Sequence, residues 1–76
     1  MEIRLREFLA KAERAVDESQ SRVDRQIYLV ETLNHRGADS IVAHQVLRAL
    51  QGNHFMLCGH RDQLKQVLEH RSPKPH

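Results

Sequence analysis

Arg36-Gly37-Ala38-Asp39-Ser40 is the stretch that decides the fold. It separates two long segments in which apolar residues recur at alternating intervals of three and four, the spacing of a packed helix seam. Gly37 tolerates the left-handed backbone conformation that closes a helix, so we expect it to end the first one. Asp39 or Ser40 can then accept hydrogen bonds from the free N–H groups that begin the second helix. Because so short a link returns the chain alongside itself, the sequence predicts an all-α, antiparallel two-helix hairpin.

We place the first helix at about residues 3–35, the turn at 36–39 and the second helix at about 40–70. Residues 1–71 then form the hairpin, and 72–76 form a polar tail that begins around Pro73. The predicted seam of the first helix comprises Leu5, Leu9, Ala12, Val16, Ser19, Val23, Gln26, Val30 and Leu33. The predicted seam of the second comprises Ala43, Val46, Leu50, Asn53, Leu57, His60 or Arg61, Leu64 and Leu68.

The middle of the predicted hairpin is polar, with Ser19, Gln26, Asn53 and His60 interrupting an otherwise apolar seam. Centring the turn on Ala38 places Ser19 opposite Leu57 and Val23 opposite Asn53. Polar groups buried between helices must be hydrogen-bonded. We therefore expect Asn53 and His60 either to bond across an interface or to mark a bend of the second helix at Gly52.

The chain is too small to be stable on a hairpin core alone. It has 76 residues, of which 39% are hydrophobic, and it contains two Phe, one Tyr and no Trp. Scaffolds of this size need disulfides, a metal or a partner, and Cys58 is the only cysteine. We therefore expect a second copy to complete a dimeric four-helix bundle. The residues predicted to be covered by that copy are Phe8, Leu29, Leu47, Phe55 and Met56.

Charge and hydropathy favour a cytoplasmic protein. The first residues alternate charged and apolar side chains, unlike a signal peptide, and no apolar run approaches the length of a membrane span. One free thiol fits a reducing compartment. The formal net charge of +2 is too small to indicate nucleic acid by itself.

The sequence is similar to a group of small uncharacterised bacterial proteins, of the alphaproteobacterial type, that form one helical hairpin. The resemblance covers about residues 8–68 and rests on 12–16, 25–26, 30–31, Leu33, the 36–40 turn, Ala43 and His60-Arg61-Asp62-Gln63-Leu64. It implies the same hairpin fold and carries no site residues. Gly52, Gly59 and the run 55–58 depart from the pattern, which leaves the continuity of the second helix open.

Two other classes of function have some support in the sequence: a metal-binding or phosphotransfer signalling module, and a nucleic-acid-binding hairpin dimer. His54 and Cys58 are four residues apart, which puts two zinc-type ligands on one helix face, although a tetrahedral site needs two more. His44, followed by Arg48, resembles the histidine of phosphotransfer helices but lacks their neighbouring motif. Arginines on both helices are also compatible with a hairpin dimer that binds nucleic acid. Such binding would weaken steeply with salt concentration, because it depends on contacts to phosphates.

No catalytic constellation is present in the sequence. His60-Arg61-Asp62 matches a kinase loop tripeptide, but no glycine-rich loop accompanies it. We expect no cofactor and no enzyme activity. The function predicted from sequence is protein–protein association, as a small accessory or regulatory homo-oligomer.

Overall fold

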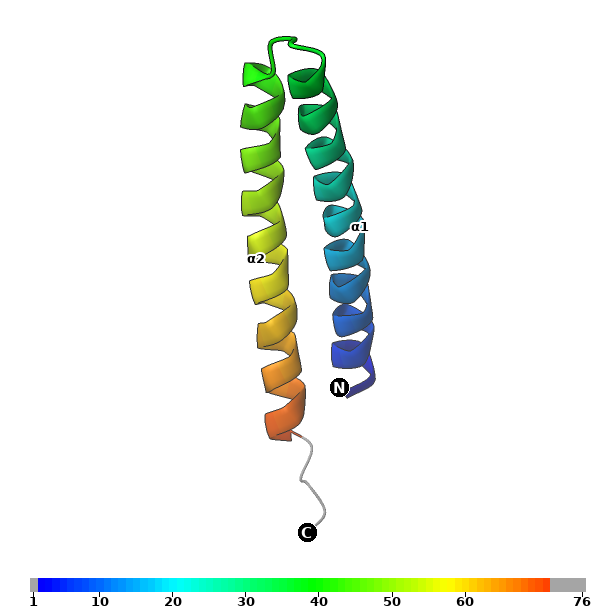
Figure 1. The fold of residues 1–76 in the computed structure, drawn as a ribbon. Helices are drawn as coiled ribbons and strands as arrows, with labels where there is room; N and C mark the ends of the chain where they lie inside the picture. Colours follow the sequence, from blue (N-terminus) through cyan, green and yellow to red (C-terminus); the bar gives the residue numbers. More distant parts are fainter. Residues whose placement is uncertain (1, 72–76) are drawn as a thin grey trace.

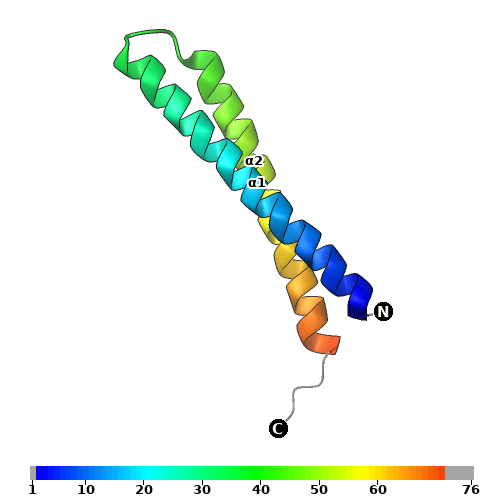
Figure 2. The same ribbon diagram turned by 90° about the vertical axis from the view of Figure 1, so that its right-hand side faces the viewer.

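The computed structural model describes residues 2–71, with side chains described for 3–70, and it is a hairpin of two long helices. Helix α1 spans Glu2–His35 and helix α2 spans Ile41–Arg71, within one residue of the bounds expected from the sequence. The helices run antiparallel and side by side (Figure 1). Turned by 90°, they cross at a shallow angle (Figure 2). The predicted tail at 72–76 lies outside the described residues.

A glycine-dependent cap ends α1. Gly37 has φ of 68°, the only positive value among the described residues, as the sequence predicts. Its N–H donates to the Asn34 carbonyl at 3.1 Å, and the Ala38 N–H donates to the Leu33 carbonyl at 2.9 Å. This pair of bonds is the Schellman arrangement, which satisfies carbonyls that the helix end leaves free.

Polar side chains from both ends of the turn fix the start of α2. The Asp39 carboxylate accepts from the Ile41 N–H at 2.9 Å, and the Ser40 carbonyl accepts from His44 N–H in the first helical bond. The Ser40 hydroxyl meanwhile donates to Asn34 Oδ1 at 2.6 Å and so ties the beginning of α2 to the end of α1. Asp39 thus caps through its side chain and Ser40 through its backbone, so the sequence prediction holds with both residues contributing.

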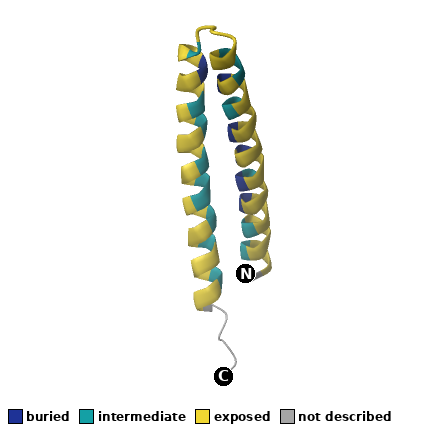
Figure 3. Cartoon of the chain, in the orientation of Figure 1, coloured by how far each residue is buried: buried dark blue, intermediate teal, exposed yellow. Residues whose placement is uncertain are grey.

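The core is narrow: the buried and half-buried residues lie along the side of each helix that faces the other (Figure 3). Its buried members are Ala12, Val16, Ser19, Val23, Val30 and Ala43. No large side chain among the described residues is fully buried. Each helix has a single neighbour, so the hairpin alone covers only one stripe of each surface.

The seam predicted for α1 agrees with the structure, but the seam predicted for α2 is partly wrong. Three residues predicted to lie in that seam are exposed: Val46, Asn53 and His60. The residue that follows each of them is half-buried against α1 instead, namely Leu47, His54 and Arg61. The observed seam of α2 is Ala43, Leu47, Leu50, His54, Leu57, Arg61, Leu64 and Leu68. Its intervals alternate strictly between four and three, which keeps every member facing α1 over the whole length. Helix α2 also continues through Gly52, without the break that the sequence allowed.

The register differs from the expected one by about one helical turn. Ser19 bonds to His54, whereas centring the turn on Ala38 places it opposite Leu57. The Schellman cap and the non-helical residues 38–40 set the level along the hairpin at which α2 begins. That offset depends on backbone geometry within the turn, which spacing along the sequence does not reveal.

Candidate functional site: a polar bridge and an uncovered apolar face

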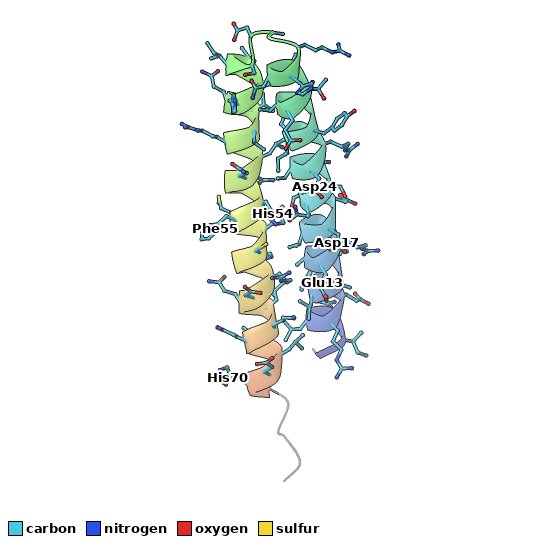
Figure 4. The ribbon with its side chains drawn as sticks, viewed as in Figure 1. Glu13, Asp17, Asp24, His54, Phe55 and His70 are labelled. Atoms are coloured by element: carbon cyan, nitrogen blue, oxygen red, sulfur yellow. The ribbon has the colours of Figure 1, made fainter. Side chains whose placement is uncertain are left out.

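A polar bridge connects the helices at mid-length. The Ser19 hydroxyl is 3% exposed and donates to the Val16 carbonyl at 2.8 Å. Its oxygen is therefore free to accept from His54 Nδ1, to which it is hydrogen-bonded. That assignment leaves His54 Nε2 as an acceptor facing Cys58 Sγ, 3.6 Å away. His54 points toward α1 in the structure (Figure 4).

The bridge brings together the two residues that the sequence offers as metal ligands, His54 and Cys58. Among the side chains of residues 3–70, no group of three or more His, Cys, Asp or Glu is arranged to hold a metal ion. The described contacts instead give His54 a structural partner in Ser19. Every buried side-chain nitrogen and oxygen in this part of the chain has a hydrogen-bond partner, so the bridge keeps polar atoms satisfied inside the seam.

A second polar contact lies nearer the turn. Gln26 Nε2 donates to the Ala43 carbonyl on α2 at 2.9 Å. Gln26 is one of the polar seam residues identified in the sequence, and it too crosses between the helices. Ser19 and Gln26 thus anchor α1 to α2 at two levels, and both are specific to one register of the hairpin.

A groove with an apolar floor lies on one side of the seam, between residues 8–15 of α1 and 57–64 of α2. It is lined by Phe8, Lys11, Ala12, Ala15, Leu57, His60 and Leu64. Ala12, Leu57 and Leu64 belong to the seam, and Phe8 and His60 form the outer walls. The groove therefore shows that the row containing Phe8 and Ala15 on α1 lies on the same side of the hairpin as the row containing His60 on α2.

Seven-residue spacing extends both rows along the hairpin. Leu29 lies fourteen residues after Ala15, so it falls on the Phe8 side of α1, while Val46 and Val67 fall on the His60 side of α2. Met56 lies beside the His60 row on α2. We give the name apolar face to the five large apolar side chains on this side of the hairpin: Phe8, Leu29, Val46, Met56 and Val67. All five are exposed, from 40% for Val67 to 73% for Met56.

The five interface residues predicted from the sequence do not share one location. Phe8, Leu29 and Met56 lie on the apolar face and are exposed, as expected. Leu47 is a correction, because it is half-buried in the seam against α1 and does not form part of an open flank. Phe55 is 79% exposed and points away from α1 (Figure 4). Val46 and Val67 are members of the face that sequence reasoning missed; shifting the seam of α2 by one residue would have revealed them.

No helix among the described residues is long and apolar enough to cross a membrane. The chain matches no protein-family model, no curated protein and no solved structure.

Proposed function

We propose that this chain is a protein-association module that works as a homodimer, in which two hairpins pack their apolar faces together as a four-helix bundle. Such a protein acts by binding and not by catalysis. The observation that carries the proposal is the apolar face of Phe8, Leu29, Val46, Met56 and Val67, which the hairpin leaves uncovered.

The thin core of the hairpin is a second observation in favour of a partner chain. Among the side chains of residues 3–70, those that are buried and apolar are only alanines and valines: Ala12, Val16, Val23, Val30 and Ala43. Fully burying a Val, Leu, Met or Phe side chain contributes about 1.5–3 kcal/mol, but the leucines of the seam are only half-buried, and Phe8, Leu29 and Met56 are exposed. Covering the five side chains of the apolar face would add stability comparable to a large fraction of the whole folding free energy of a small domain, about 5–15 kcal/mol.

The open face also has the form that helix packing requires. Its rows follow the hairpin at seven-residue spacing, and an apolar groove lies between them at residues 8–15 of α1 and 57–64 of α2. A second hairpin that packs against this face buries its own identical face at the same time, which is how a two-fold dimer forms. One hairpin with one apolar face favours a closed dimer over an open filament.

Sedimentation equilibrium at micromolar concentration tests the proposal. We expect a mass twice that of the 8.9 kDa chain. Leu29→Lys should shift the population toward single chains, and Tyr28→Lys is the matched control. Tyr28 is the adjacent residue, is more exposed than Leu29 and points about 100° further round α1. A fully helical wild-type chain that sediments as a monomer would show the proposal to be wrong.

A further inference from the structure

Helix α2 carries a second heptad seam that does not face α1. Val42, Val46, Ala49, Asn53, Met56, His60, Gln63 and Val67 alternate by four and three, each one residue before a member of the seam that packs on α1. We call this row the outer seam. A helix with two adjacent seams is typical of a bundle in which that helix contacts two neighbours. The hairpin supplies only one of them.

The outer seam contains no Asp, Glu, Lys or Arg over its entire length. Between Val42 and His70 the charged residues of α2 lie elsewhere, at Arg48, Arg61, Asp62, Lys65 and Glu69. Arg61 is in the seam against α1, where it pairs with Asp62 at 3.0 Å. The other charges lie on the opposite flank or the back of α2. A helix that stays exposed to water normally carries charged residues on its outer surface, so an uncharged row of this length is unusual there.

The equivalent row of α1 differs. Its members, again one residue before each seam position, are Arg4, Phe8, Lys11, Ala15, Glu18, Arg22, Arg25, Leu29 and Thr32. Four of these are basic and one is acidic. Two copies of this row placed in direct contact would bring like charges together, which opposes association. Of the two helices, only α2 has an outer surface that can lie against its own copy without such repulsion.

The outer surface of α2 also leaves room for a second helix to pack closely against it. Val42 and Met56 are each at least 70% exposed, so the hairpin gives them no packing partner. Gly52 and Gly59 lie beside the outer seam, and a Cβ at either position would meet nothing within 4 Å. Without side chains there, another helix can approach the α2 backbone on both sides of Met56.

We propose that α2 is the central helix of the dimer: its outer seam packs against the outer seam of α2 in a second copy, and α1 lies on the outside. This inference rests on the proposed dimer and adds which helices meet. The basic members of the α1 row, Arg4, Lys11, Arg22 and Arg25, then stay in water at the rim of the dimer. Phe8 and Leu29 of the same row cover the edges of the contact, and Phe55 takes no part in it.

Met56→Lys and Phe55→Lys test the arrangement as a matched pair. The two residues are consecutive on α2 and similarly exposed, at 73% and 79%, so their effects on the isolated hairpin should be alike. Only Met56 is in the outer seam. We expect Met56→Lys to raise the dimer dissociation constant at least about tenfold, the effect of losing a central interface residue. Phe55→Lys should leave the constant near the wild-type value.

Sedimentation equilibrium gives the dissociation constants, and circular dichroism shows that each variant is helical. Gln63→Lys, in the outer seam, and Gln51→Lys, on the flank that carries Lys65, are a second pair in case either first variant fails to fold. The same split between them is expected. A dimer weakened by Phe55→Lys but not by Met56→Lys, or by neither, would overturn the central position of α2 and leave the dimer itself standing. A monomeric wild type would overturn the proposed function as well.

Discussion

Ser19 of α1 and His54 of α2 are hydrogen-bonded across the hairpin through the hydroxyl oxygen and Nδ1. The two residues are 35 positions apart in the chain, and the bond forms in one register only. A slip of one turn would leave the buried Ser19 hydroxyl and the imidazole facing apolar side chains. The bond therefore makes the register specific at the level where the seam is least apolar.

Ser19→Ala should destabilise the fold by about 1 kcal/mol, because it leaves the His54 N–H without its partner inside the seam. His54→Leu in the same chain should restore most of that loss, since leucine suits the seam position. Thermal or urea unfolding of the two single variants and the double variant, at one protein concentration, gives the coupling between the two sites. Additive effects would contradict a direct bond between Ser19 and His54.

Gly37→Val should cost more than about 1 kcal/mol, because β-branched residues resist the left-handed conformation. Gly52→Ala is the control when both are measured on the single chain, below the dimer dissociation constant, since Gly52 is helical and has open space around it in the hairpin. That substitution should raise the free energy of unfolding by about 0.5–1 kcal/mol. Denaturant unfolding measures both. Equal changes at the two glycines would show that the turn does not depend on the conformation of residue 37.

Asp39→Ala should destabilise α2 by about 0.5–2 kcal/mol through loss of the carboxylate that accepts from the Ile41 N–H. Asp39→Asn is the matched variant, because its side-chain oxygen can accept the same bond. We expect amide hydrogen exchange to rise in the first turn of α2 for the alanine variant only. Faster exchange in both variants would indicate that the negative charge matters and not the bond.

Asn53→Leu distinguishes the hairpin from the dimer. Asn53 is exposed in the hairpin, and helix α2 continues through it without a break. A leucine at this position should therefore change the stability of a single hairpin little. In the outer seam, however, leucine replaces a polar contact with an apolar one. The dissociation constant of the dimer should therefore fall, and the variant should also form oligomers of more than two chains more readily. Sedimentation at several concentrations measures both effects. A weaker dimer would point to a required hydrogen bond from Asn53.

The sequence by itself determined the local features of this protein. The helix bounds follow from apolar periodicity, and the break follows from Gly37, because only a few residue types tolerate a positive φ. The cap at Asp39 follows from its short carboxylate side chain. The seam of α1 was equally readable, since its apolar intervals admit one helix face. Each of these features depends on residues within a few positions of one another.

Only the tertiary structure decided which face of α2 meets α1. Leucines and valines are spread around this helix, so two rows one residue apart both appear to be seams: that of Val46 and Asn53, and that of Leu47 and His54. Periodicity alone does not choose between them. The geometry of the cap and the fit of His54 against Ser19 make the choice, because pairing between helices depends on where both chains lie in space and not on either sequence alone.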